Sequence, residues 1–291
     1  MKALLLFLWL SIPLTLLAQN SLLESRLLEA AKWGQYDEIK AVFEEAEKEN
    51  ITLNLEVKGG FYSTTPLYKV VNNAMKDNIE DSLSIMLLLN KGADIHFTDK
   101  FGGNLLHLAA DNRLLWLAKR CVDAGIDVNS KSGVYFTPLY QALINRDEQM
   151  IHFLIDNGAD VLTIEPVLEQ SMLHLAAENE LFWLIKLCIE RGADINRLSG
   201  SGLTPLLYLC QKPVCNMKIF YWLIQHGANT EYAMTTAVEA GNTEVIRYFL
   251  KNSDKISPNT GTLYKNNRLI ELNDTTSVDK VFSNKERKSL S

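Results

Sequence analysis

Two stretches of the chain decide its fold: NLLHLAADNRLLWLAKRCVDAGIDVN at residues 104–129 and SMLHLAAENELFWLIKLCIERGADIN at residues 171–196. They share the pattern L-H-L-A-A-x-N-x-L-x-W-L-x-K-x-C and start 67 residues apart, which is two units of a period near 33. The glycine that begins G-A-D or a near variant marks the same period, at Gly92, Gly125, Gly158, Gly192 and Gly227. A period of this length predicts a stack of repeated supersecondary units.

A second series runs in step with these glycines. Five variants of one tetrapeptide occupy residues 65–68, 104–107, 137–140, 171–174 and 204–207, with Thr-Pro-Leu-Tyr, Asn-Leu-Leu-His and Ser-Met-Leu-His among them. Here the chain resembles the ankyrin-repeat family, whose T-P-L-H-x-A signature and 33-residue period these residues match. The resemblance covers Glu24 to Ser253. It implies an all-α ankyrin-repeat solenoid of about seven helix-turn-helix units with short β-hairpin fingers.

The recurring residues have physical roles within each unit. Thr or Ser caps a helix N-terminus, and Pro at the next position is already set to helical φ. The Gly of G-A-D ends the second helix in the left-handed conformation. Between the two helices the family usually has Gly, whereas this chain has Arg113, Arg146 and Glu180, each preceded by Asn. Because Asn tolerates left-handed φ better than most residues, we expect the turn geometry to be kept by means other than glycine.

The repeats set the domain boundaries. Gly34 and Gly241 identify degenerate first and last copies, so we expect about seven repeats over residues 24–253. Insertions around residues 72–81 and 212–216 fall between the two helices of their repeats. We expect a partly disordered tail at residues 254–291, with a hairpin where residues 263–265 and 268–270 flank Asn266-Asn267.

The first 18 residues have the layout of a secretory signal peptide. Met1 and Lys2 precede an apolar run that ends at Ala18 before polar Gln19-Asn20. The run is shorter than the roughly 20 residues of a membrane span and contains Pro13, so an uncleaved anchor is the weaker alternative. We expect cleavage after Ala18 and export, to a bacterial periplasm first and the extracellular space second.

The charge balance excludes some classes of partner. The 291 residues hold 29 Lys and Arg against 35 Asp and Glu, a net charge of −6. A general electrostatic affinity for nucleic acid or for an anionic membrane is therefore not expected. We expect a monomer that binds another protein, with no stable membrane anchor after signal cleavage.

No pattern in the sequence indicates catalysis or a cofactor. The five histidines have no metal-binding spacing, and there is no nucleophile elbow or phosphate-binding glycine loop. His107 and His174 occupy the tetrapeptide's own His position, where we expect hydrogen bonds that brace adjacent repeats. Glu44, Glu45, Glu47 and Glu49 are interpreted as the solvated face of a terminal repeat. We therefore expect a protein that is not an enzyme, with no metal or other cofactor.

The four cysteines divide into two kinds. Cys121 and Cys188 share one core position two repeats apart, too far for a disulfide, and should be buried thiols. Cys210 and Cys215 flank Pro213 within an insertion. They could close a disulfide after export, and the alternative is two more buried thiols.

Several finger positions that are usually polar are apolar here, and they are the candidate contact residues. They are Phe97, Tyr135, Phe136, Ile164 and Val167, with Leu168 beside them. Aromatic residues are enriched at binding hot spots, although Phe97, Tyr135 and Phe136 could equally fold back onto neighbouring fingers. Phe101 is expected to be structural, and the register of Phe61-Tyr62 is too loose to judge.

The resemblance together with export suggests a protein-interaction scaffold that binds through its fingers and concave face. One narrower form is an immunity or inhibitor protein, since ankyrin-like proteins accompany secreted toxins in some bacteria. A second hypothesis is an enzyme or accessory subunit whose site is completed by the tail or by the insertion at residues 72–81. A third is a secreted effector that binds a host protein.

Overall fold

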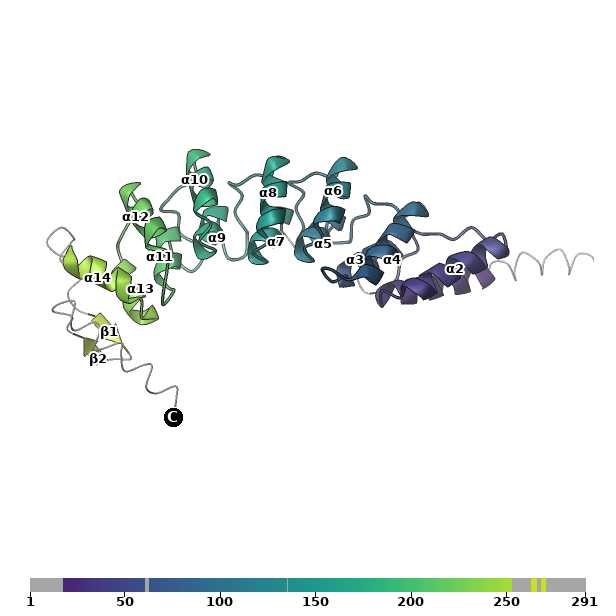
Figure 1. The fold of residues 1–291 in the computed structure, drawn as a ribbon, viewed down its shortest axis with the longest axis horizontal. Helices are drawn as coiled ribbons and strands as arrows, with labels where there is room; N and C mark the ends of the chain where they lie inside the picture. The colour runs from purple at the N-terminus through teal and green to yellow at the C-terminus, as the bar shows by residue number, and fades with distance from the viewer. Residues whose placement is uncertain (1–17, 61–62, 135, 253–262, 266–267, 271–291) are drawn as a thin grey trace, which may run out of the picture. The chain divides into compact units, whose positions relative to one another are not determined.

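A computed structural model describes residues 18–60, 63–134, 136–252, 263–265 and 268–270 (Figure 1). Its contacts divide the chain into two compact units, Met1–Ala159 and Asp160–Ser291. Among the described residues each unit is a series of helix pairs, four in the first unit and three in the second. The expected all-α ankyrin-repeat fold of about seven helix-turn-helix units is therefore confirmed.

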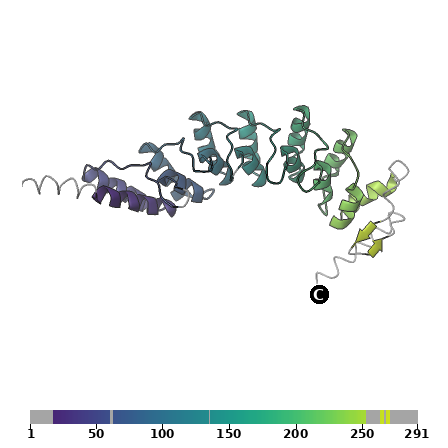
Figure 2. The same ribbon diagram turned by 180° about the vertical axis from the view of Figure 1, so that it is seen from behind.

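The first unit holds repeats one to four. Its first pair is the helical stretch at residues 18–32 with α2 (Tyr36–Lys48). The next three pairs are α3 (Pro66–Asn73) with α4 (Ile79–Asn90), α5 (Leu105–Asp111) with α6 (Leu115–Asp123), and α7 (Pro138–Ile144) with α8 (Glu148–Asp156). The first helix of each repeat packs on its neighbours, so α3, α5 and α7 form a row (Figures 1 and 2).

The second unit holds repeats five to seven and a small hairpin. Its pairs are α9 (Met172–Glu178) with α10 (Phe182–Glu190), α11 (Pro205–Cys210) with α12 (Met217–Gln225), and α13 (Ala233–Ala240) with α14 (Thr243–Lys251). Here α9, α11 and α13 form the row of first helices. The expected hairpin is confirmed: β1 (Leu263–Lys265) pairs antiparallel with β2 (Arg268–Ile270), with Leu263 opposite Ile270.

Local chemistry starts and ends many of the helices as the sequence predicts. Thr65 and Thr137 accept the backbone N–H of Tyr68 and Tyr140 at 3.3 and 3.2 Å, and a proline follows each threonine. The five glycines after the second helices have φ between 87° and 95°, a conformation open to Gly without steric cost. The helix that precedes α2 is present from residue 18, and Leu23, one residue before the predicted start of the repeats, is fully buried.

The turns between paired helices keep their geometry without glycine, as expected, but the left-handed residue is not the Asn. Arg113, Arg146 and Glu180 themselves adopt left-handed φ of 60°, 54° and 57°, while the preceding Asn residues do not. The Asn side chains instead link repeats. Asn112 Nδ2 donates to Val71 O at 2.7 Å and Asn145 Nδ2 to Asp111 O at 2.8 Å. These bonds to the preceding repeat help offset a left-handed conformation that costs a non-glycine residue about 1–2 kcal/mol.

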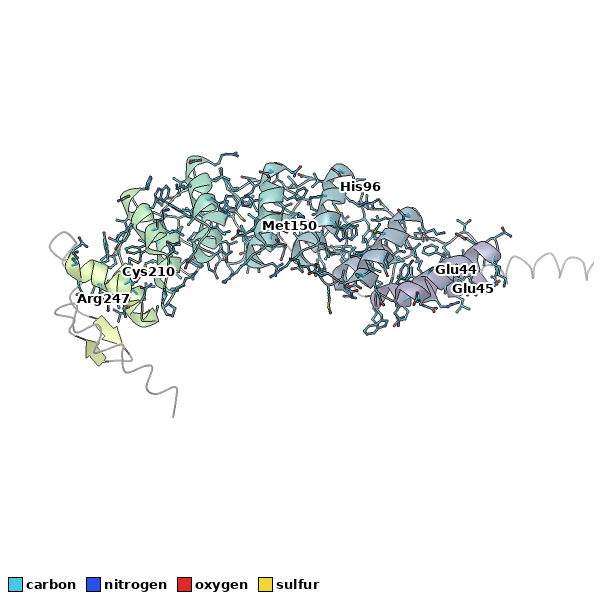
Figure 3. The ribbon with its side chains drawn as sticks, viewed as in Figure 1. Glu44, Glu45, His96, Met150, Cys210 and Arg247 are labelled. Carbon is cyan, nitrogen blue, oxygen red and sulfur yellow. The ribbon has the colours of Figure 1, made fainter. Side chains whose placement is uncertain are left out.

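In each unit the core lies between the row of first helices and the row of second helices. The fingers are the loops that connect one repeat to the next. In Figure 3 the labelled Met150 and Cys210 belong to this core, and both are fully buried. The fingers are closed by single antiparallel bridges, which pair Gly59 with Thr64, Thr98 with Asn104, Ser132 with Phe136 and Ile164 with Ser171. This arrangement leaves one side of the first helices and the fingers beside them available for contacts.

Candidate functional site

Two of the candidate contact residues are part of the core, which favours the alternative that they fold back over the one that they are exposed contacts. Phe97 is 8% exposed and its ring stands edge-on against Tyr68, with centroids 5.6 Å apart. Phe136 is 9% exposed and contacts Tyr140 in the same way, also at 5.6 Å. Each phenylalanine folds back onto the first helix beside its finger, because that position buries its apolar surface. Tyr135, Phe61 and Tyr62 lie outside the described residues, and Phe101 is 40% exposed.

The apolar finger of the second unit does present its side chains to solvent. Val167 is 81% exposed, Leu168 53% and Ile164 37%. The fingertip is held by Glu165, whose buried carboxylate accepts the N–H groups of Val167 and Leu168 at 2.7 and 2.5 Å. This finger therefore displays apolar side chains from a preorganised turn.

A second bond ties this finger to the next one. Gly200 N donates to Leu168 O at 2.8 Å, so the finger that carries Leu198 lies alongside. Leu198 and Leu162 are also largely exposed. We call Leu162, Ile164, Val167, Leu168 and Leu198 the apolar finger surface. An exposed apolar group of this kind is typical of a protein-interaction site.

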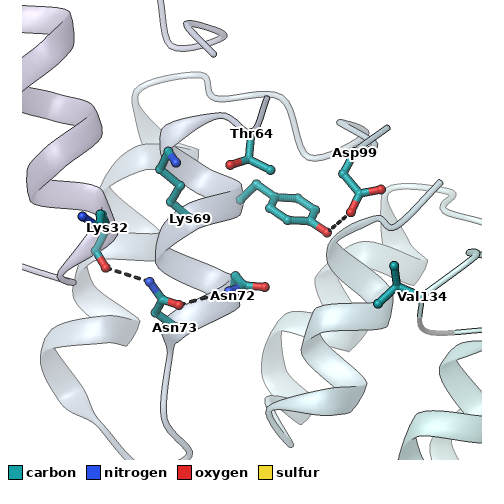
Figure 4. Close-up of a pocket in the computed structure, with 8 residues that line it drawn as sticks. Lys32, Thr64, Lys69, Asn72, Asn73, Asp99 and Val134 are labelled. Atoms are coloured by element: carbon teal, nitrogen blue, oxygen red, sulfur yellow. Dashed lines mark hydrogen bonds between the residues drawn. The ribbon is translucent and has the colours of Figure 1, made fainter. Parts of the chain in front are cut away.

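A cleft in the first unit forms a separate candidate site. It has a volume of about 320 Å³ and lies between the first helices and the fingers beside them (Figure 4). Lys32 and Lys69 lie at one end, and Asp99 and Val134 at the other. Thr64, Tyr68, Asn72 and Asn73 complete the lining. The cleft brings together residues from several repeats, as expected for a concave binding face.

The Asp99 carboxylate in this cleft is already engaged. One oxygen accepts the N–H groups of Phe101 and Gly103, both at 2.8 Å, and the other accepts the Tyr68 hydroxyl at 2.7 Å. Asp99 is also buried. These donors leave little of its charge available to a ligand, and their arrangement indicates that Asp99 shapes the finger.

Lys69 is the least compensated charge in the cleft. It is half-buried, and no described residue forms an ion pair with it within 4.0 Å. Burial lowers the pKa of the Lys69 ammonium, repulsion from Lys32 adds to this effect, and the Glu29 carboxylate opposes it. An anionic group placed here would stabilise the charged ammonium.

Lys69 also stands out in the sequence, although none of the recurring motifs includes it. Lys69 directly follows the tetrapeptide, at the position that Leu108 and Leu175 occupy in their repeats. Both leucines are almost fully buried. A lysine at a position where these two repeats have a buried leucine marks a local change in the surface of the first helix.

His107 and His174 brace adjacent repeats as expected, and both are fully buried. His107 Nδ1 accepts the Asn104 N–H, and Nε2 lies 3.1 Å from Ser130 O and 3.3 Å from Phe136 O. The equivalent distances from His174 Nε2 to Arg197 O and Leu203 O are 3.1 and 3.0 Å. Burial lowers the pKa of both imidazoles, which favours the neutral form that these bonds require.

The cysteines are buried and free in the structure. Burial raises the pKa of the Cys121 and Cys188 thiols to about 12. Cys210 and Cys215 form no disulfide, and Cys215 Sγ instead lies 3.3 Å from Asn242 Nδ2. Burial raises the pKa of these two thiols as well, so the alternative of two more buried thiols describes the structure.

The acidic cluster of the first repeat is engaged in local ion pairs. Arg26 contacts Glu38 at 2.8 Å and Glu45 at 2.6 Å, and Lys91 pairs with Glu47. The labelled Glu44 and Glu45 lie on α2 in Figure 3. The described part of the chain contains no group of three or more potential metal ligands. Within the same residues, no helix has the length and apolar character needed to cross a membrane.

Comparison with known proteins agrees with the repeat geometry. The family model described as ankyrin repeats (3 copies) matches residues 73–164 and 173–261, which is more than half of the chain. The nuclear factor NF-kappa-B p105 subunit of Gallus gallus is 27% identical over 172 residues, which cover 58% of this chain and 17% of that protein.

Two further relatives extend the comparison. Protein lin-12 of Caenorhabditis elegans is 25% identical over 222 residues, which cover 69% of this chain and 14% of the relative. Ankyrin repeat and SOCS box protein 6 of Homo sapiens is 30% identical over 133 residues, or 44% of this chain and 32% of the relative. The matches therefore span a third or less of these longer proteins.

Proposed function

This chain belongs to the ankyrin-repeat family, and from that premise we propose that it is a non-enzymatic scaffold that binds another protein through its fingers and concave face. Ankyrin repeats are protein–protein interaction scaffolds, and stacked repeats offer a long surface relative to their core. The observation that carries the proposal is the apolar finger surface. Its leucines and valine are exposed on turns that Glu165 and Gly200 hold in place.

The rigidity of this surface matters for binding. A fingertip that is already ordered loses less conformational freedom when a partner docks on it. Apolar side chains on such a tip bury their surface without an opposing cost of polar desolvation. The finger therefore offers a partner an apolar surface that is already ordered.

We expect the double substitution Val167→Asp with Leu168→Asp to reduce partner recovery at least about tenfold, because hot-spot losses of about 2 kcal/mol or more have this effect. The measurement is affinity purification of the tagged protein from its own cells, with recovered partners quantified by mass spectrometry. Val214→Asp is the matched control, since Val214 is 76% exposed in the loop between α11 and α12. Equal partner recovery by the double variant and the control would remove the finger from the binding surface.

We further propose that the protein is exported to the periplasm, with the extracellular space as the second location. The support is the charged start, apolar run and polar boundary of residues 1–20. Cleavage after Ala18 would leave the buried Leu23 and Leu27 in the mature protein. An immunity or inhibitor role is the narrower form of the proposal, and a secreted toxin among the purified partners would support it. A host-cell protein as the partner would instead support the secreted effector.

We expect the protein from a periplasmic fraction to begin at Gln19, because a signal peptidase cuts at the polar boundary of the apolar run. Amino-terminal sequencing of the purified protein measures this directly. Recovery of the intact chain, beginning at Met1, from the cytoplasmic fraction would contradict export.

The enzyme or accessory alternative has one observation in its favour. The cleft of the first unit includes Asn72 and Asn73 at the edge of the insertion, together with polar groups from other repeats. Its carboxylate, however, is Asp99, which three donors already engage. A general base needs a carboxylate that can reach a substrate proton, so this arrangement supports ligand binding better than catalysis.

A further inference from the structure

We propose that the cleft of the first unit binds an acidic segment of a partner protein, with Lys32 and Lys69 facing its carboxylates. This inference rests on the proposed function and adds the chemistry of the partner. The chain as a whole carries a net charge of −6, so a local excess of positive charge at a cleft is a specific feature of this face.

Lys69 carries the first step of the argument. A Cβ built at Gly60 would lie 3.3 Å from Lys69 Nζ, so the ammonium lies against the first finger and is partly withdrawn from water. A half-buried ammonium without an ion-pair partner among the described residues is costly to maintain. A carboxylate delivered by a ligand would supply the missing counter-charge and a charge-assisted hydrogen bond.

The carboxylates at both ends of the cleft, Glu29 and Asp99, already have partners within the protein. Glu29 accepts the Trp33 indole N–H at 2.8 Å and pairs with Lys32 at 3.5 Å. Asp99 accepts its three donors at the opposite end. The negative charges of Glu29 and Asp99 are therefore compensated within the protein, whereas the positive charge of Lys69 is not.

The fingers beside the cleft add further lysines. Lys58, Lys100 and Lys131 lie on three successive fingers, the same fingers that contribute Thr64, Asp99 and Val134 to the cleft. Lys58 Nζ lies 5.3 Å from the Phe97 ring centroid and Lys131 Nζ 6.0 Å from that of Phe136. These aromatic rings favour positions for the ammonium groups at the base of the fingers. A row of cations along one edge matches an extended segment with several carboxylates.

Nucleic acid fits this surface less well than an acidic peptide. Sequence-independent binding of single strands combines phosphate contacts with exposed aromatic rings on which bases stack. Tyr68 in the cleft and Phe97 and Phe136 at its fingers are buried and cannot offer their faces. Among the described rings beside the cleft, this leaves only the exposed Trp33 and Phe101. The net negative charge of the chain also opposes a long polyanion.

The test uses the full chain and three fluorescein-labelled peptides of about ten residues, with alternating Glu-Ser, Gln-Ser or Lys-Ser sequence. Fluorescence anisotropy at low salt should show that the Glu-Ser peptide binds at least about tenfold more tightly than the Gln-Ser peptide, with no binding of the Lys-Ser peptide. Raising the salt concentration should weaken the Glu-Ser complex, since ion pairs at a surface are screened.

Two variants locate the site. Lys69→Gln should weaken Glu-Ser binding about fivefold, because the variant loses a charge-assisted hydrogen bond to the peptide carboxylate. Lys119→Gln is the matched control on the exposed side of α6 in the same unit and should bind like the wild type. Circular dichroism confirms that both variants are folded.

Three outcomes overturn the proposal. They are equal binding of the Glu-Ser and Gln-Ser peptides, an equal effect of the Lys69 and Lys119 substitutions, or tighter binding of an oligothymidylate of about ten nucleotides than of the Glu-Ser peptide. Loss of the cellular partner from the Val167 and Leu168 variant, combined with no Glu-Ser binding, would leave the scaffold function standing and remove only the acidic segment. Unchanged partner recovery by the Val167 and Leu168 variant, combined with Glu-Ser binding that depends on Lys69, would exclude only the apolar finger surface as a contact site.

Discussion

Replacing His107 with alanine is expected to lower the free energy of unfolding by about 3 kcal/mol. The substitution creates a cavity in a fully buried site and leaves Ser130 O and Phe136 O without the imidazole donor. Both carbonyls belong to the finger of the next repeat, so the loss acts on the contact between repeats. Urea denaturation followed by circular dichroism measures the change.

The matched control is His96→Ala. His96 is exposed, and its replacement should change the free energy of unfolding by less than about 0.5 kcal/mol. Native-state hydrogen exchange adds a test of location. Because repeats contact only their neighbours, protection should fall most in α5, α7 and the finger between them. A loss below about 1 kcal/mol for His107→Ala would show that these bonds contribute little to stability.

Replacing Phe220 with alanine is expected to cost about 4 kcal/mol in the second unit. Phe220 is fully buried, and its ring lies edge-on to three others, with centroid distances of 5.2 Å to Tyr248, 5.8 Å to Tyr221 and 6.1 Å to Phe249. The alanine variant removes the central ring of this group and leaves a cavity between α12 and α14. Chemical denaturation monitored by tyrosine and tryptophan fluorescence reports the change.

Phe220→Leu is the control for size, since leucine retains most of the buried apolar surface and should cost about 1.5 kcal/mol. Similar losses for the alanine and leucine variants would mean that the edge-on ring contacts, and not the filled volume, dominate at this position. A small loss for both would place Phe220 outside the cooperative core of the unit.

These core contacts also bear on the proposed function. The His107 and His174 bonds end on finger carbonyls, so the same imidazoles that join repeats hold the fingers at their bases. A finger that is fixed at its base presents its tip in one geometry, which reduces the entropy lost on binding. Substitutions at these histidines should therefore be avoided when binding residues are mapped.

The elements with local causes were predictable from the sequence. Threonine followed by proline starts α3, α7 and α11 through one side chain and one fixed φ, and a glycine with left-handed φ follows the second helices of repeats two to six. The hairpin formed by β1 and β2 follows from a turn pair between two short apolar stretches. The period itself places His107 and His174 at equivalent sites, which is why their shared role could be predicted.

The orientation of finger side chains was not predictable in the same way. The sequence left open whether Phe97 and Phe136 are exposed or fold back. In the structure each meets a tyrosine of a first helix, 29 residues earlier for Phe97 and four residues later for Phe136. No period in the sequence states which side of a finger faces the helices. Val167 and Leu168 are exposed on a turn in which their backbone N–H groups donate to the Glu165 carboxylate.

The sequence alone thus determined the repeat, the helix boundaries and the family, because these depend on caps, glycines and apolar spacing within one unit of about 33 residues. The tertiary structure decided which surfaces remain available. Lys32 and Lys69 come from different repeats, and they share a cleft only because stacking places successive first helices side by side. Burial and charge compensation depend on these contacts between repeats, and no residue carries that information by itself.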